Sequence, residues 1–263
     1  MRLCRLFASI AFGLFVLTAC NPSSDKPAAP GTATSTPASS AAATAPSTAP
    51  AANQPPAPVQ ASEQNGGQYT MLATPQPTED SSGKTEVLEF FGYFCNHCHA
   101  LDPALNAWVK KQSNRIAFKR IPVRPDEGKL YYALEAMGKL DALHEKIFNA
   151  VQVERKRVHN ESAAADLVAQ FGVDRNAFIE QYNSFSVQSK VMAAANTAKA
   201  YGIDGVPMVA IDGRFITSGS HAAKRPGTEQ TEAGLYKSML AIMDELLAKA
   251  RQERGAGAKA ATK

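Results

Sequence analysis

The chain has 263 residues, of which 44% are hydrophobic and 20% are charged, and this balance fits one globular domain with appended segments. Its formal net charge is +4, and without residues 1–19, which contain two arginines and no acidic residue, 26 basic residues face 24 acidic ones, a net charge of +2. So small an excess, with few aromatic residues beside it, argues against a nucleic-acid-binding protein.

The first residues have the pattern of an export signal. Arg2 and Arg5 precede an apolar run at residues 10–17, which is too short to span a membrane as a stable helix. The run ends in Leu-Thr-Ala-Cys at residues 17–20, which is similar to the lipobox of bacterial lipoproteins. We therefore expect a lipoprotein signal peptide at residues 1–19 and a lipidated Cys20, with a plain signal peptide as the alternative.

Residues 20–64 are expected to form a tether. After Cys20 they are mostly Ala, Pro, Ser and Thr, with hardly any charged or large apolar side chains. Such a segment cannot bury enough apolar surface to offset the conformational entropy that is lost on ordering. The composition therefore predicts a disordered connection between the lipid anchor and a folded domain.

The folded domain is predicted to begin with alternating strands and one helix. Apolar runs predict strands at Gln68–Ala73, Val87–Phe91 and Ile116–Val123. Between the last two, a helix is expected from Cys95 to Gln112, with a kink at Pro103 because proline cannot donate the backbone hydrogen bond.

Residues 128–201 change to a helical pattern, in which apolar side chains recur at intervals of three and four. Gly172 follows one of these stretches and suits a helix C-terminus. A further strand is expected at Met208–Ile211, followed by an Asp212-Gly213 turn, a returning strand at Phe215–Thr217 and a helix at Leu235–Ala248.

These elements predict a small α/β core, residues 65–125 and 201–250, that carries an all-helical insertion at residues 126–200. Residues 251–263 are expected to form a frayed basic tail. His144, His159 and His221 lie outside any motif and are interpreted as surface or local structural residues.

Cysteine usage points to redox chemistry. Cys4 lies in the predicted signal and Cys20 at the lipidation position, so that only Cys95 and Cys98 remain in the mature chain. A disulfide across two residues closes a very small loop and barely restricts the unfolded chain, which makes it a poor structural crosslink. One close pair in an exported protein therefore favours a redox-active C-x-x-C motif.

The position of this motif has a physical logic. Cys95 is expected at the first turn of a helix, where free backbone N–H groups and the helix dipole stabilise a thiolate. Cys95 then becomes a nucleophile of lowered pKa and Cys98, more buried, resolves the mixed disulfide. A positive or donating His97 ring beside Cys95 adds to this effect. Because a stabilised thiolate favours the reduced form, such a protein tends to give its disulfide away.

Three other interpretations fit the motif. Cys95, Cys98 and His99 also match C-x-x-C-H, the attachment motif of c-type haem, which would make the chain an electron carrier. The second interpretation is a metal site formed by these three residues and His97. Its four side chains would have to converge on one ion, but neighbouring side chains on a helix face different directions. A lipoprotein with an inert disulfide is the third possibility.

The motif and its surroundings resemble the DsbA family of thioredoxin-fold oxidases. The resemblance rests on residues 87–91 running into Phe94-Cys95-x-His97-Cys98 and on Gly205-Val206-Pro207 downstream. It extends to residues 68–72 and 183–185 and covers about residues 67–250. The resemblance implies a thioredoxin fold with the helical insertion.

The resemblance also implies roles for individual residues. Cys95 would attack, Cys98 would resolve and His97 would stabilise the thiolate. Glu89 would be a buried acid that relays protons, with an exposed strand carboxylate as the alternative reading. Val206 and Pro207 would bind substrate, with Pro207 as a cis-proline that faces the cysteines rather than an ordinary trans-proline at a strand start.

By the same resemblance, the substrates would be reduced, unfolded exported proteins, and a DsbB-like, quinone-linked protein of the inner membrane would reoxidise the cysteines. No dissociable cofactor is needed, and a monomer on the periplasmic side of the cell envelope is expected. Asn96 departs from the family, whose usual dipeptide is Pro-His, and it leaves the redox potential open. A reductase or isomerase of the same fold is therefore the alternative.

Overall fold

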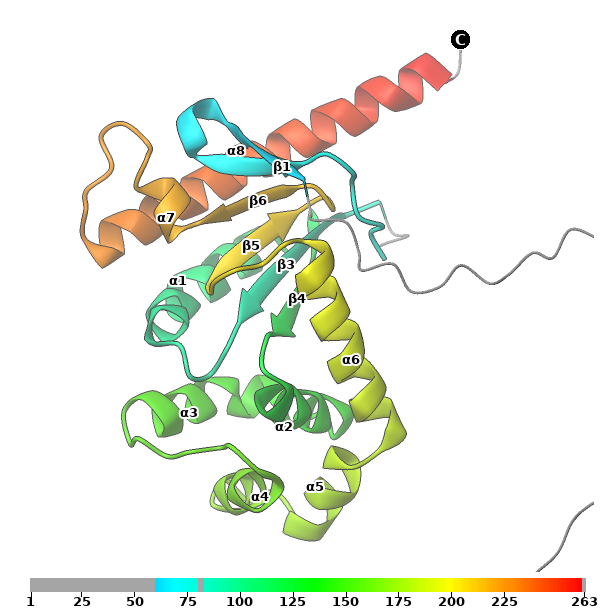
Figure 1. Cartoon of the computed structure of the whole chain (residues 1–263), viewed down its shortest axis with the longest axis vertical. Coiled ribbons are helices and arrows are strands. Elements are labelled where there is room, and N and C mark those ends of the chain that lie inside the picture. Colours follow the sequence, from blue (N-terminus) through cyan, green and yellow to red (C-terminus); the bar gives the residue numbers. More distant parts are fainter. Residues whose placement is uncertain (1–59, 80–82, 262–263) are drawn as a thin grey trace, which may run out of the picture. The chain divides into compact units, whose positions relative to one another are not determined.

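The computed structural model describes residues 60–79 and 83–261, with side chains as far as residue 256 (Figure 1). The predicted signal peptide, Cys20 and residues 21–59 of the predicted tether lie outside this range. No helix within the described ranges is long and apolar enough to cross a membrane.

Six strands form one mixed sheet in the order β1-β2-β6-β5-β3-β4. Only β3 and β4 pair in parallel, and every other neighbouring pair is antiparallel. The strands are β1 (Ala61–Gln64), β2 (Tyr69–Leu72), β3 (Thr85–Phe91), β4 (Ile116–Pro122), β5 (Met208–Ile211) and β6 (Phe215–Ser218).

The helices divide into a group on the sheet and an inserted group (Figure 1). On one face of the sheet lie α1 (Asn96–Gln112) and α8 (Glu232–Ala261), with the short α7 (Gly219–Ala222) beside α8. Between β4 and β5 the chain forms α2 (Pro125–Ala136), α3 (Leu140–Gln152), α4 (Glu161–Ala169), α5 (Arg175–Tyr182) and α6 (Phe185–Ala200). The predicted α/β fold with a helical insertion is confirmed.

Strand β3 organises the core because all seven of its residues are buried. Side chains alternate between the two faces of a strand. Val87 accordingly packs with α1 and α8, whereas Leu88 and Phe90 pack on the opposite face with Tyr201 after α6. Phe91, at the end of the strand, already belongs to the core of the helical insertion.

The insertion has its own apolar core, and both cysteines of the C-x-x-C motif are part of it. Helices α4, α5 and α6 begin at side-chain caps, since Asn160, Asp174 and Ser184 each accept a backbone N–H three residues further on. Gly172 has φ +82°, the left-handed conformation expected after the end of α4.

The predicted tether is wrong at its end, because residues 61–64 form β1 and pair with β2. Three of these four residues are exposed, so no alternation of apolar and polar side chains marks the strand in the sequence. It is held by main-chain pairing with β2 and by an ion pair from Glu63 to Lys224 near α7.

The predicted frayed tail is also wrong, because α8 continues through Ala261. Ala250 is fully buried, and Arg254 donates to the Lys84 carbonyl oxygen and pairs with Asp212. Contacts with the residues next to β3 and β5 therefore support the helix as far as Arg254, beyond the amphipathic stretch that the sequence shows.

The turn between β5 and β6 generates a prediction about stability. Gly213 has φ +71°, and a Cβ added there would lie 2.3 Å from the Gln76 carbonyl oxygen. Gly138, with φ +64°, has no atom within 4 Å of the same position. We expect Gly138→Ala to lower the free energy of unfolding by about 1 kcal/mol and Gly213→Ala by at least about 2 kcal/mol. Equal losses on urea unfolding of the two variants would contradict this reading.

Candidate active site

Cys95 is the N-cap of α1, and its sulfur occupies the position of a capping side chain. The Cys98 backbone N–H donates to the Cys95 Sγ over 3.1 Å, and both cysteines are free thiols. Cys98 is fully buried and Cys95 is only 7% exposed. The Cys95 thiol donates to the Val206 carbonyl oxygen over 3.5 Å.

The two thiols are electrostatically unequal. The hydrogen bond from the Cys98 thiol, with the Cys98 backbone N–H and the charge of His97, lowers the pKa of Cys95 to about 7, although burial opposes the shift. Burial, together with the neighbouring Cys95, raises the pKa of Cys98 well above its ordinary value. Cys95 therefore loses its proton first, while Cys98 keeps its own.

His97 reaches this pair by charge and through its backbone N–H, both of which lower the pKa of Cys95. Its ring turns toward the start of α8, where Nδ1 lies 2.7 Å from Glu232 Oε1. The Tyr236 hydroxyl lies 2.9 Å from both the His97 carbonyl oxygen and Glu232 Oε1. Among the contacts of the described residues, none joins the His97 ring to the Cys95 sulfur. Asn96, the first residue of α1, is exposed.

The Val206–Pro207 peptide bond is cis, as the resemblance implied. This bond lies opposite Cys95, since the Val206 carbonyl oxygen contacts the sulfur. A cleft of ≈ 510 Å³ adjoins it, and His97, Val206, Pro207 and Tyr236 are among the residues that line this cleft.

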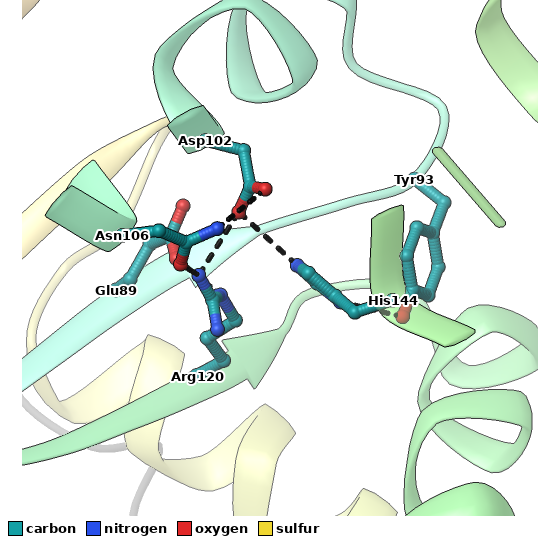
Figure 2. Close-up of polar contacts among 6 residues, drawn as sticks. All are labelled: Glu89, Tyr93, Asp102, Asn106, Arg120 and His144. Atoms are coloured by element: carbon teal, nitrogen blue, oxygen red, sulfur yellow. Dashed lines mark hydrogen bonds and ion pairs between the residues drawn. The ribbon is translucent and has the colours of Figure 1, made fainter. Parts of the chain in front are cut away.

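A group of buried charged side chains connects β3, β4 and α1 (Figure 2), and the charge of its member Glu89 acts on Cys98. Glu89 on β3 is directly paired with Arg120 on β4, and Glu89 Oε2 accepts from Arg120 Nε over 2.8 Å. Arg120 Nη2 also donates to Asp102 Oδ1 over 2.9 Å and to Asn106 Oδ1 over 2.5 Å, both on α1. The parallel register of the two strands places the pair on the face that α1 covers.

Glu89 is 1% exposed, so the alternative hypothesis of an exposed strand carboxylate is wrong. Burial raises its pKa to about 7, against the opposing charge of Arg120, and the negative charge of Asp102 adds to the rise. Burial would also raise the pKa of Asp102, but the neighbouring His144 and the positive charge of Arg120 lower it below its ordinary value. Glu89 is thus the carboxyl of this group that exchanges a proton near neutral pH.

Of the two interpretations of His144, the surface one is wrong, because the side chain is buried on α3. Figure 2 shows its contacts with Tyr93 and Asp102. Its Nδ1 lies 2.8 Å from the Tyr93 hydroxyl, and its Nε2 lies 3.3 Å from Asp102 Oδ1 without the geometry of a hydrogen bond. The amphipathic pattern of the sequence does indicate that His144 is buried, since position 144 falls on the same helical face as Ile147 and Phe148.

Two further side chains of the insertion hold the loop before Cys95, and the sequence analysis predicted a role for neither. The Glu127 carboxylate accepts from the Tyr93 N–H over 2.8 Å and the Phe94 N–H over 3.0 Å. Gln152 Nε2 donates to the Tyr93 carbonyl oxygen over 2.6 Å. Burial raises the pKa of Glu127 to about 7, against the two backbone N–H donors.

The structure also shows the surroundings of His99, which the haem-attachment and metal-site interpretations both use. His99 stacks on Phe148 and lies 3.2 Å from Asn149, both on α3. Nowhere in residues 60–79 and 83–261 do three or more His, Cys, Asp or Glu side chains converge as metal ligands would.

A mixed sheet with a C-x-x-C pair at a helix N-terminus and a cis-proline opposite its first sulfur defines a thioredoxin-fold thiol:disulfide oxidoreductase. A family model described as a DSBA-like thioredoxin domain matches residues 126–225. The chain belongs to the DsbA family.

Relatives of known name and structure agree. The thiol:disulfide interchange protein DsbA of Burkholderia cepacia is 41% identical over 184 residues, which are 68% of this chain and 87% of that protein. The DsbA of Bordetella parapertussis is 37% identical over 194 residues, 72% of this chain and 87% of that protein. The crystal structure of Pseudomonas aeruginosa DsbA superposes with a TM-score of 0.63 at 30% identity, covering 72% of this chain and 94% of that chain.

Glu89 should make the protein less stable as the pH approaches neutrality. Its pKa is about 7 in the folded state against 4.5 in the reference state, so the folded protein keeps a proton that the unfolded chain releases between these values. The free energy of unfolding therefore falls as the pH rises through this window, by about 2 kcal/mol between pH 5 and pH 7.5.

Urea unfolding at these two pH values tests the assignment. We expect the fall in the free energy of unfolding between these pH values to be smaller by about 2 kcal/mol in Glu89→Gln. A part of the fall should remain, because the pKa of Glu127 is also about 7. The matched control Glu180→Gln, on an exposed position of α5, should keep the full decline. A Glu89→Gln variant that declines as steeply as the unaltered protein would contradict the pKa assignment.

Proposed function

We propose that this protein donates its Cys95–Cys98 disulfide to cysteine pairs of exported proteins. The observation that carries the proposal is the Cys98 N–H bonded to the Cys95 sulfur at the start of α1. This bond, with the neighbouring thiol and the charge of His97, favours a Cys95 thiolate near neutral pH. Since that thiolate exists only in the reduced protein, its stabilisation drives the disulfide toward reduction, and a substrate is oxidised in exchange.

The reaction takes two exchange steps. A substrate thiolate attacks the Cys95 sulfur, the Cys95–Cys98 bond breaks, and Cys98 leaves as a thiolate that takes up a proton. A second substrate thiolate then attacks the substrate sulfur of the mixed disulfide, and Cys95 leaves as a thiolate. The substrate gains a disulfide, and its two electrons remain on the cysteine pair.

Cys98 needs a proton in a place that water does not reach, because it is fully buried. We assign its supply to Glu89, a buried carboxyl whose charge raises the pKa of Cys98 and which holds a proton up to about pH 7. Val206 and Pro207 would receive the substrate as an extended segment at the cleft, and Asn96 would adjust the potential by its place at the start of α1.

The signal-like N-terminus and the resemblance to the DsbA family support a setting at the cell envelope. Cys20 would carry lipid and residues 21–59 would connect the domain to a membrane at the periplasmic side of the cell envelope; these residues lie outside the described ones. The substrates would be reduced, unfolded exported proteins, and a DsbB-like, quinone-linked membrane protein would take the electrons. The protein would act as a monomer and without a dissociable cofactor.

Two serine variants separate the roles of the cysteines. Cys95→Ser should abolish oxidation of a reduced, unfolded substrate, because no sulfur remains to accept attack. Cys98→Ser should not complete a cycle but should accumulate mixed disulfides through Cys95, since the resolving thiol is missing. Substrate oxidation and non-reducing gels measure the two effects. Residual oxidase activity in Cys95→Ser would contradict the assignment.

The reduction potential decides the direction of exchange. After equilibration of the full-length protein with glutathione buffers, we expect a potential well above that of thioredoxin, about −270 mV. Asn96→Pro, which restores the family's usual dipeptide and leaves the thiols in place, serves as the matched comparison. A thioredoxin-like potential in the unaltered protein would instead indicate a reductase or isomerase.

A further inference from the structure

The permanently charged side chains that line the cleft beside the cis-proline are all acidic. Of the side chains that line it, two are carboxylates, Asp204 and Glu232, two are histidines, His97 and His221, and none is a lysine or arginine. The remaining lining is neutral and includes Ser218 and Leu235. A cationic group that enters this cleft therefore meets two acids and no permanent positive charge.

Both carboxylates are exposed at the cleft and retain capacity for a further partner. Asp204 has no ion pair with any cation of the described residues, and Glu232 uses only its Oε1 toward His97 and Tyr236. Even when a protonated His97 offsets Glu232, Asp204 leaves the cleft negative. Burial and the charge of Lys224 lower the pKa of His221, which keeps this ring neutral at neutral pH, and Lys224 itself is paired with Glu63.

This local sign is opposite to that of the chain without its predicted signal peptide, whose formal net charge is +2. A chain with a small positive net charge has no long-range attraction for basic substrates, so a preference for them has to come from the cleft itself. We infer that the cleft selects substrate segments in which lysine or arginine lies close to the reacting cysteine.

The geometry explains why such residues would reach the cleft. The Cys95 sulfur lies 3.5 Å from the Val206 carbonyl oxygen, and Val206 lines the cleft. A substrate joined to Cys95 by a disulfide therefore has its neighbouring residues beside Val206, at the cleft that Asp204 and Glu232 also line. The inference deepens the proposed function and rests on it, because it concerns segments held in the mixed disulfide.

Short peptides with one cysteine test the inference. In three peptides the two residues on each side of the cysteine are lysine, serine or glutamate, and the rate of mixed-disulfide formation with the oxidised full-length protein is followed by mass spectrometry after acid quenching. At low salt we expect the lysine peptide to react about fivefold faster than the glutamate peptide once the thiolate fraction of each peptide is matched. In about 1 M salt, where the Debye length is about 3 Å, the ratio should approach one.

Variants locate the effect. Asp204→Asn should reduce the lysine-to-glutamate ratio about twofold and Asp204→Asn with Glu232→Gln should bring it to about one. Glu180→Gln, an exposed acid on α5 outside the cleft, should leave the ratio unchanged. The ratio, rather than the absolute rate, is the readout, since Glu232 also holds His97.

Two kinds of failure are distinguishable. If the serine peptide reacts but the lysine-to-glutamate ratio is near one at low salt, or persists in the double variant, the charge preference is overturned and the proposed function stands. If no peptide forms a mixed disulfide with Cys95, the proposed function fails and the inference fails with it.

Discussion

The hydrogen bond from the Cys98 N–H to the Cys95 sulfur is the contact on which the rest of the site depends. It exists because β3 ends at Phe91, three residues form a loop, and α1 then begins with a cysteine in the capping position. The N-terminus of a helix offers unpaired N–H groups and a partial positive charge, which stabilise an anionic sulfur there. At Cys98, burial and the neighbouring Cys95 outweigh the one backbone hydrogen bond, from Gly92, that favours its thiolate, which makes the two thiols unequal.

The helical insertion is part of this arrangement rather than an addition to it. Glu127 accepts from the Tyr93 N–H, and Gln152 donates to the Tyr93 carbonyl oxygen. His144 is hydrogen-bonded to the Tyr93 hydroxyl. The loop that leads to Cys95 is thereby fixed from α2 and α3, while β3 fixes it from the sheet. Because both cysteines also pack in the insertion's apolar core, a shift of α2 or α3 would be transmitted to the start of α1.

Local signals in the sequence predicted much of this molecule. The apolar run of β3, the three-and-four spacing of the insertion and the Asp212-Gly213 turn each specify their element within a few residues. Contacts across the fold could not be predicted in this way. Glu127 meets Tyr93 across 34 residues and His144 meets it across 51, and nothing near either residue marks the partner. Strand β1 and the end of α8 were missed for the same reason, since each is ordered by a distant segment.

The buried charges of Glu89, Arg120 and Asp102 are poorly explained by stability alone. Removing charges from water is costly, and apolar residues of similar volume often stabilise a core as well or better. At Glu89 the cost of burial exceeds the attraction of Arg120, since the pKa rises to about 7 instead of falling. An ion pair optimised for stability would have the opposite shift. A carboxyl held at this balance can give and take a proton at neutral pH with little free-energy change, which is what a leaving thiolate at the fully buried Cys98 requires.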